Sequence, residues 1–276
     1  MAFTQTAPAN GANIPLLGLG TWQLRDKVCS RIVEQALRLG YRHIDTAQAY
    51  ENERDVGEGV RNSGLPRNEI FVTTKVWYTN LAPANVLRSA RESLARLKLD
   101  YVDLLLIHWP NASVPLDQTL SALCKAKRDG ITRNIGISNF PVALVQQAVQ
   151  MATEPIAANQ IEMHVYLDQS KVKAACEREG IAVTAYSPIA KGSGSGDPML
   201  AKIGRAHGKS EAQICLRYLV QQGVVVIPRT SKLERLSENA GIFDFELSEA
   251  EMTELRGLAR PNGRMISPSW APEWDR

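Results

Sequence analysis

The chain has 276 residues, of which 44% are hydrophobic, and 32 basic residues stand against 29 acidic ones, a formal net charge of +3. This length suits one large domain or two smaller ones, and the interspersed charges give no footprint of a nucleic-acid or membrane-surface binder. Four widely spaced cysteines form no zinc or redox motif, and neither an 18-residue apolar run nor a signal sequence occurs. We therefore expect a cytoplasmic protein.

The first 40 residues predict a hairpin, a short strand and a helix. Residues 1–15 are small and polar, with a turn-forming Asn-Gly-Ala-Asn at 10–13 between two short segments. Residues 16–20 form an apolar run with two glycines, which is typical of a short strand. Apolar side chains at helical spacing over 27–39, followed by Gly40, predict the first helix.

From there apolar runs alternate with amphipathic stretches. The apolar runs predict strands near 41–45, 70–74, 102–107, 132–137, 156–161, 181–186 and 223–227. The amphipathic stretches predict helices near 52–62, 83–97, 117–129, 141–151, 170–179 and 210–221. With residues 16–20 this makes eight strands that alternate with helices, which indicates a parallel sheet. Eight such units in this length fit a (β/α)8 barrel better than an open doubly wound sheet.

No linker or shift in composition marks a domain boundary, so residues 1–276 are predicted to form a single domain. The glycine- and serine-rich stretch at 191–196 is predicted to be a flexible loop. Further helices are predicted over 233–239 and 247–258, the second opened by a capping box. The tail at 261–276 holds three prolines and two tryptophans, so we expect it to pack over another part of the protein.

Successive predicted strands end in residues that are unusual in a core. Asp45, Lys75 and His108 follow three such runs, and Tyr50 lies five residues beyond Asp45. Each alone has an ordinary explanation, as a turn cap, a solvated charge, a satisfied imidazole or a packing ring. In a barrel, however, the carboxyl ends of the strands bear the active site, so all four together predict a proton-donating device.

The chemistry of these four residue types is complementary. Tyrosine has a reference pKa of about 10, so a nearby Lys75 would favour its phenolate, and Asp45 would hold Lys75 charged. His108 would donate a hydrogen bond that polarises a carbonyl oxygen.

A nucleotide site is expected in the loops after strands seven and eight. Gly18-Leu19-Gly20 lacks the third glycine of a Rossmann fingerprint. Barrels instead bind phosphate in those loops, where residues 187–192, 229–232 and Arg235 supply cations and hydroxyls. A solvated charge cluster is the alternative.

These motifs resemble those of the aldo-keto reductases over nearly the whole chain. The matching stretches are 18–22, 45–53, 74–77, 99–110, 136–140 and 159–162. The ending at 264–268 and 271–275 is most similar to the bacterial 2,5-diketo-D-gluconate reductase B and methylglyoxal reductase branch.

The resemblance implies a (β/α)8 barrel that binds NADPH across its C-terminal mouth. It implies a catalytic tetrad of Asp45, Tyr50, Lys75 and His108, in which Tyr50 is the general acid. The implied contacts to the nicotinamide are Ser138, Asn139, Gln160 and the stacking ring of Tyr186, and those to the pyrophosphate are Ser187 and Ile189. The implied contacts to the 2′-phosphate are Arg229, Thr230 and Arg235, and those near the adenine are Glu238 and Asn239. The remaining implied cofactor contacts are Gly20, Thr21, Trp22, Asp45, Pro188, Ile227 and Ser231, and the implied substrate contacts are Trp22, Tyr50, Trp77, His108 and Trp109.

The implied activity is the NADPH-dependent reduction of small aldehydes, ketoaldehydes or keto-sugars by a monomer that needs no metal and binds neither nucleic acid nor membrane. Arg229 and Thr230 stand where many members carry lysine and serine, which keeps a positive charge and a hydroxyl for NADPH. One alternative is a nicotinamide-binding regulatory subunit with slow chemistry. Another is a metal-dependent barrel isomerase or hydrolase, although the four histidines include no cluster at the strand ends.

Overall fold

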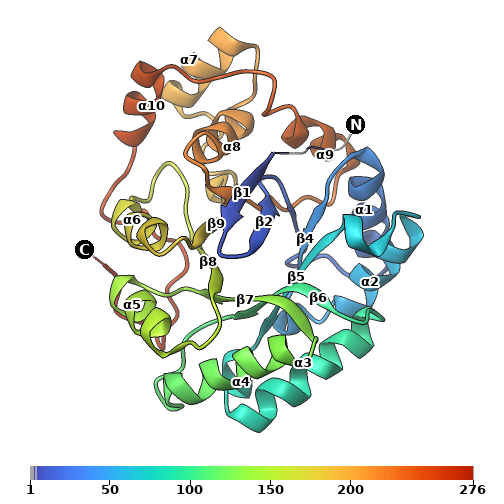
Figure 1. The fold of residues 1–276 in the computed structure, drawn as a ribbon. Helices are drawn as coiled ribbons and strands as arrows, with labels where there is room; N and C mark the ends of the chain where they lie inside the picture. Colours follow the sequence, from blue (N-terminus) through green and yellow to red (C-terminus); the bar gives the residue numbers. More distant parts are fainter. Residues whose placement is uncertain (1–2, 4, 276) are drawn as a thin grey trace.

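The computed structural model describes residue 3 and residues 5–275. Eight parallel strands lie in chain order in one sheet, ringed by helices (Figure 1). The strands are β3 (Leu19–Gly20), β4 (His43–Asp45), β5 (Phe71–Val76), β6 (Val102–Ile107), β7 (Thr132–Ser138), β8 (Ile156–Glu162), β9 (Ala182–Tyr186) and β10 (Val225–Val226). Parallel bridges from Leu17 to Val226 and from Gly20 to Arg229 join the first strand to the last. The sheet therefore closes, and the predicted (β/α)8 barrel is confirmed.

The two strands that close the barrel, which we call the seam strands, are shorter than the sequence predicts. The strands expected at 16–20 and 223–227 are only two residues long in the structure, as β3 and β10. A Cβ atom on Gly20 would lie 2.6 Å from the carbonyl oxygen of Ile227. Only glycine allows the two chain segments to approach this closely.

Ten α-helices surround the barrel in the described part of the chain. They are α1 (Asp26–Leu39), α2 (Glu53–Asn62), α3 (Pro83–Leu97), α4 (Leu116–Arg128), α5 (Val142–Met151), α6 (Ser170–Arg178), α7 (Pro198–His207), α8 (Glu211–Val220), α9 (Leu233–Ala240) and α10 (Glu249–Arg256). Nine of them match a predicted helix to within two residues at each end, and the capping box of Ser248 and Glu251 opens α10 as predicted. Among the described residues, no helix is long and apolar enough to cross a membrane.

Helix α7 is the one α-helix that the sequence patterns did not predict. This helix begins after Asp197, whose side chain accepts hydrogen bonds from the backbone N–H groups of Met199 and Leu200. Pro198 occupies its first turn, and Gly208 ends it in the left-handed conformation. These are ordinary helix-end signals, but they directly adjoin the glycine- and serine-rich loop, whose irregular composition hides the beginning of the helix.

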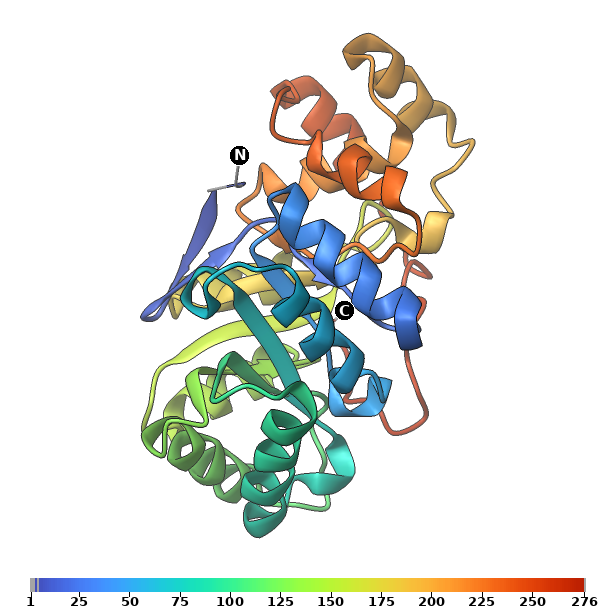
Figure 2. The same ribbon diagram turned by 90° about the vertical axis from the view of Figure 1, so that its right-hand side faces the viewer.

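Two antiparallel strands, β1 (Thr6–Ala9) and β2 (Ala12–Pro15), form the predicted N-terminal hairpin, although residues 1, 2 and 4 of the predicted segment lie outside the described residues. The side chain of Ile14 is fully buried, and Asn10 donates hydrogen bonds to the carbonyl oxygens of Ile156 and Glu179. The hairpin covers one end of the barrel, and the C-terminal tail crosses the opposite end (Figure 2). The strands' carboxyl ends therefore open under the tail.

Candidate active site

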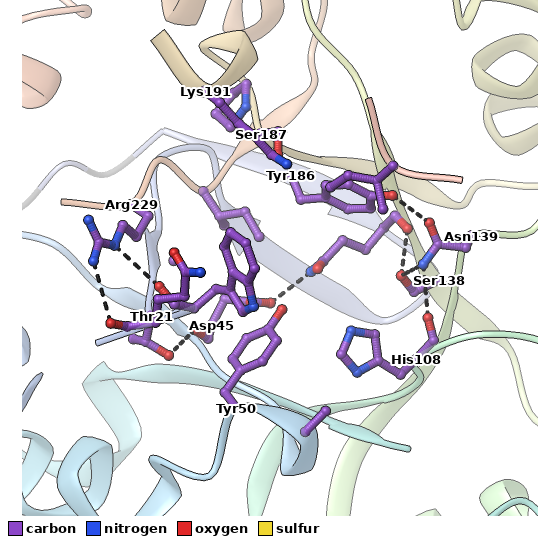
Figure 3. Close-up of a pocket in the computed structure, with 18 of the residues that line it drawn as sticks. Thr21, Asp45, Tyr50, His108, Ser138, Asn139, Tyr186, Ser187, Lys191 and Arg229 are labelled. Carbon is purple, nitrogen blue, oxygen red and sulfur yellow. Dashed lines mark hydrogen bonds between the residues drawn. The ribbon is translucent and has the colours of Figure 1, made fainter. Parts of the chain in front are cut away.

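The four residues of the predicted tetrad come together at the carboxyl ends of three adjacent strands. Asp45 ends β4, Lys75 is the penultimate residue of β5, and His108 directly follows β6. Tyr50 closes a 3-10 turn, η1 (Gln48–Tyr50), that follows β4. Figure 3 shows Tyr50 and His108 side by side at one edge of a cavity, with Tyr186 across from them.

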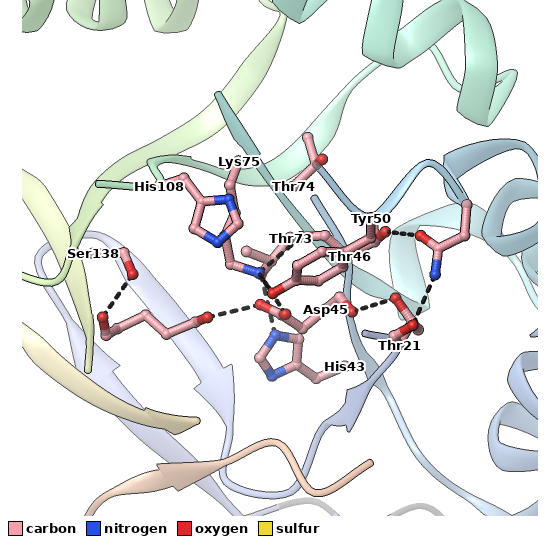
Figure 4. A network of polar contacts seen from close by, with 12 residues as sticks. Thr21, His43, Asp45, Thr46, Tyr50, Thr73, Thr74, Lys75, His108 and Ser138 are labelled. Atoms are coloured by element: carbon pink, nitrogen blue, oxygen red, sulfur yellow. Dashed lines mark hydrogen bonds and ion pairs between the residues drawn. The ribbon is translucent and has the colours of Figure 1, made fainter. Parts of the chain in front are cut away.

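Lys75 is at the centre of the polar network drawn in Figure 4. Its Nζ atom lies 2.6 Å from Asp45 Oδ1, 2.9 Å from the carbonyl oxygen of Thr46 and 3.3 Å from the Tyr50 hydroxyl. An ammonium group has three donors, and three acceptors surround this one, although its side chain is fully buried. Because the Tyr50 oxygen accepts a hydrogen bond from Lys75, the phenol proton is left to point elsewhere.

The carboxylate of Asp45 is held on both oxygens. Its Oδ1 pairs with Lys75, and its Oδ2 accepts a 2.7 Å hydrogen bond from Nε2 of Gln160, the residue predicted to contact a nicotinamide amide. A buried charge is tolerated only when it is paired and hydrogen-bonded in this way. The pair therefore links the tetrad to the end of β8.

Burial, followed by the negative charge of Asp45, raises the pKa of Tyr50 well above its usual value. Burial also lowers the pKa of Lys75, against the opposing effect of Asp45. The pKa of Tyr50 is raised although Lys75 donates a hydrogen bond to its oxygen, so that a stabilisation of the phenolate by Lys75 stays a prediction for the moment after proton transfer. Tyr50 keeps its proton at neutral pH, as a proton donor must.

His108 is neutral at physiological pH, because burial and the positive charge of Lys75 lower its pKa well below the usual value. A neutral imidazole carries one N–H group, which can donate to a substrate oxygen. Its ring packs edge to face with that of Tyr50, with the centroids 5.6 Å apart. Among the described residues its Nδ1 atom has no hydrogen-bond partner, although it is buried.

A cavity of about 700 Å³ opens above these residues. All five predicted substrate contacts line it: Trp22, Tyr50, Trp77, His108 and Trp109. Ile266 of the C-terminal tail completes this part of the wall, as expected of a tail that packs over the barrel. The four predicted nicotinamide contacts line the same cavity: Ser138, Asn139, Gln160 and Tyr186. So do the other predicted cofactor contacts Gly20, Thr21, Asp45, Ser187, Pro188, Ile189, Ile227 and Arg229.

A second cavity of about 510 Å³ adjoins the first and shares Ile189, Gly192 and Arg229 with it. Its lining includes three cations, Arg229, Lys232 and Arg235. It also includes the predicted contacts Thr230, Ser231 and Asn239, together with the hydroxyls of Ser195 and Ser210. Cations beside hydroxyls suit a phosphate group, so the two cavities fit the two ends of NADPH.

Two features of this region differ from the predicted contacts. Glu238 is not among the described lining residues of either cavity, and instead forms an ion pair with Arg235 at 2.7 Å. Lys191, which belongs to the predicted phosphate-binding stretch 187–192, lines the first cavity and not the second, and lies over the ring of Trp22 at 5.7 Å.

The polar groups around the nicotinamide end of the cavity hold one another in place. The Tyr186 hydroxyl donates to Asn139 Oδ1 at 2.8 Å, and Asn139 Nδ2 donates to the carbonyl oxygen of His108 at 2.9 Å. Asn139 itself adopts the left-handed conformation, with φ 64°. Backbone strain of this kind gathers at functional sites, and here it connects the ends of β6, β7 and β9.

Comparison with known proteins gives one family. Residues 16–260 match the model of the Aldo/keto reductase family. The methylglyoxal reductase DkgB of Yersinia pestis is 44% identical over 267 residues, which are 95% of this chain and 100% of the relative. The glyoxal reductase of Bacillus subtilis is 41% identical, with 90% of each chain covered.

Solved structures agree with this assignment. A crystal structure assigned as 2,5-diketo-D-gluconic acid reductase B superposes with a TM-score of 0.97 at 47% identity, over 99% of this chain and 98% of that one. A Bombyx mori aldo-keto reductase in complex with NADP superposes with a TM-score of 0.89 at 33% identity, over 98% and 96% of the two chains. Sequence and fold therefore lead to the same relatives.

Proposed function

Since this chain belongs to the aldo/keto reductase family and is an NADPH-dependent carbonyl reductase, we propose that it reduces small 2-oxoaldehydes such as methylglyoxal, with Tyr50 as the proton donor. The observation that carries the proposal is the Asp45–Lys75–Tyr50 network beside His108, at the floor of a cavity walled by tryptophans. This arrangement places a protonated phenol and a neutral imidazole together where a carbonyl oxygen would lie.

Bound NADPH supplies the hydride that reduces the carbonyl carbon. The chain's own residues bind and protonate the carbonyl oxygen of the substrate. The neutral His108 donates a hydrogen bond that orients and polarises it, and Tyr50 transfers its phenol proton to it, so that an alcohol leaves. Lys75 then stabilises the phenolate left on Tyr50 through the 3.3 Å contact, while Asp45 holds Lys75 in place.

The cofactor would lie along the two adjoining cavities. Tyr186 would stack on the nicotinamide, with Ser138, Asn139 and Gln160 at its amide. Arg229, Lys232 and Arg235 would face the 2′-phosphate, a group that NADH lacks, which favours NADPH. Arg235 forms an ion pair with Glu238, so a bound phosphate would compete with Glu238 for the Arg235 guanidinium.

The aromatic wall of the cavity supports a small substrate. Trp22, Trp77 and Trp109 give the cavity an apolar wall, and two relatives carry the names methylglyoxal reductase and glyoxal reductase. A keto-sugar acid is the second candidate, because the 47% identical structure is assigned as a 2,5-diketo-D-gluconic acid reductase. We expect the enzyme to act as a monomer in the cytoplasm.

Loss of NADPH absorbance with methylglyoxal and with 2,5-diketo-D-gluconate tests the proposal in the wild type and in Tyr50→Phe. The variant should bind NADPH normally but lose about 10²- to 10⁴-fold in kcat, the usual contribution of a positioned general acid. Tyr41→Phe is the matched control, because Tyr41 is buried away from the cavities and its hydroxyl donates to the carbonyl oxygen of Leu236.

Equal rates in the wild type and Tyr50→Phe would mean that another group donates the proton. If the wild type binds NADPH but reduces neither substrate nor a broad panel of carbonyls, the regulatory-subunit alternative would take its place.

A further inference from the structure

The carboxylate of Glu162 is buried at the last position of β8 and faces the backbone of the C-terminal tail. Its Oε1 accepts a 2.7 Å hydrogen bond from the N–H of Met265, and its Oε2 accepts a 2.9 Å bond from the N–H of Ile266. His164 Nε2 lies 3.1 Å from Oε1, and the side chain of Glu162 is fully buried. Both oxygens of Glu162 therefore accept a backbone hydrogen bond from the tail.

We call residues 263–275 the mouth strap. It is fixed at three further points along its length. At its start, Gly263 packs so closely on the carbonyl oxygen of Tyr166 that no Cβ atom would fit. In its middle, Trp270 stacks on Tyr78 with the ring centroids 4.4 Å apart. At its end, Asp275 Oδ2 accepts a 2.9 Å hydrogen bond from the N–H of Val142, at the beginning of α5.

Glu162 ties the strap to the two strands, β8 and β9, that carry the predicted nicotinamide contacts Gln160 and Tyr186. It is paired in register with Tyr186 on β9 and stands two residues after Gln160, which bonds Asp45. On its other side it holds the backbone of Ile266, whose side chain lines the cavity beside the tryptophans. One buried side chain therefore connects the barrel to the part of the cavity wall that the C-terminal tail contributes.

A buried carboxylate is costly and is kept only where its hydrogen bonds are made. Here two of the three bonds go to a segment more than 100 residues away in the chain. Hydrogen bonds to a charged group are also the strong ones. The strap's backbone at 265–266 is thus fixed more firmly than aromatic packing alone would fix it.

We infer that Glu162 is a positioning residue that fastens the mouth strap and thereby sets the shape of the carbonyl pocket. It takes no part in the transfer of hydride or proton, and acts through Ile266 and Trp270. The inference rests on the proposed function, since the pocket it shapes is the proposed substrate site. It locates the control of substrate affinity in a side chain of the barrel that is not among the described residues lining the cavity.

The test compares Glu162→Gln with the wild type in steady-state reduction of methylglyoxal, in NADPH binding and in limited trypsin digestion. Glutamine has the same shape, but its NH2 group cannot accept a hydrogen bond, so one strap N–H loses its partner. We expect KM to rise about tenfold while kcat and the NADPH dissociation constant stay within about twofold, the pattern of lost uniform binding. Cleavage after Arg264, whose guanidinium packs on the Trp274 ring at 3.7 Å, should become faster.

Asp103→Asn is the matched control. Asp103 is also a buried carboxylate on a barrel strand that accepts a backbone hydrogen bond, from Val72 at 2.9 Å, but it lies at the opposite end of β6 from His108. It should lower stability without changing KM or the cleavage after Arg264. Asp275→Ala loosens the strap from its far end without touching the barrel, and should raise KM and cleavage in the same direction as Glu162→Gln.

An unchanged KM together with unchanged cleavage in Glu162→Gln would overturn the inference, as would a control variant that behaves identically to it. Should Glu162→Gln fail to fold, an Asp275→Ala variant with wild-type KM would overturn it instead. Failure of the proposed function is distinct, because the wild type itself would then reduce no carbonyl while the cleavage pattern still reported on the strap.

Discussion

At the scale of single residues, the ion pair between Lys75 and Asp45 combines stability with chemistry. Both side chains are buried, so Lys75→Met leaves the Asp45 carboxylate without its counter-charge. Breaking a buried pair in this way costs about 3–5 kcal/mol. We expect urea denaturation to show a loss of that size, alongside a loss of reductase activity.

The double variant Asp45→Asn with Lys75→Met removes both charges. It should be more stable than the sum of the two single losses predicts, while remaining inactive. Additive losses would show that the two groups do not depend on each other.

The sequence predicted the members of this site better than their electrostatics. Asp45, Lys75 and His108 follow successive predicted strands, and parallel strands place their carboxyl ends together, so the sequence predicted that these three side chains meet in one site. The direction of the Tyr50 pKa was not predictable, since it depends on how deeply the ring is buried. The contacts of Glu162 with Met265 and Ile266 were equally hidden, because these residues lie more than 100 positions further along the chain.

At the scale of whole elements, the packing of α2 against α3 depends on one glycine. A Cβ atom on Gly57 would collide with the carbonyl oxygen of Leu97 at the end of α3. Gly57→Ala should therefore lower the free energy of unfolding by about 1–3 kcal/mol through overpacking, although alanine is the better helix former by about 1 kcal/mol. Thermal or urea unfolding measures the change.

Glu58→Ala is the neighbouring control, because Glu58 is exposed on the same helix. It should leave stability nearly unchanged. A stabilised Gly57→Ala would mean that α2 can move away from α3 without loss.

The elements that the sequence patterns missed or overestimated have local physical causes. Helix α7 directly follows the glycine- and serine-rich loop at 191–196, whose irregular composition hides the beginning of the helix although its end signals are clear. The seam strands β3 and β10 are short because few of their residues find a partner across the closing gap. Periodicity predicts which face of an element is buried, but pairing across a seam is a property of the closed barrel.

At the scale of the whole molecule, buried neutral histidines make stability depend on pH. Burial lowers the pKa of His43 to about 4, and that of His108 also falls well below its usual value. Between pH 6.5 and 4 the unfolded chain binds protons that the folded protein does not, so stability falls as the pH is lowered. For His43 alone the loss at pH 5 is about 2 kcal/mol.

His43→Gln checks this contribution. The difference in the free energy of unfolding between pH 7.5 and pH 5, measured with urea, should shrink by about 2 kcal/mol in the variant relative to the wild type. The same difference in both proteins would show that His43 titrates normally in the fold.

The aromatic wall of the mouth has an optical consequence. All five tryptophans of the chain stand at this one end of the barrel: Trp22, Trp77 and Trp109 in the cavity wall, and Trp270 and Trp274 in contact with Trp109. Intrinsic tryptophan emission therefore reports only on the mouth of the barrel, because the end covered by the N-terminal hairpin contains no tryptophan. Far-ultraviolet circular dichroism reports on the whole barrel, so a separation of the two signals during denaturation would mark a mouth that loosens while the barrel beneath it is still folded.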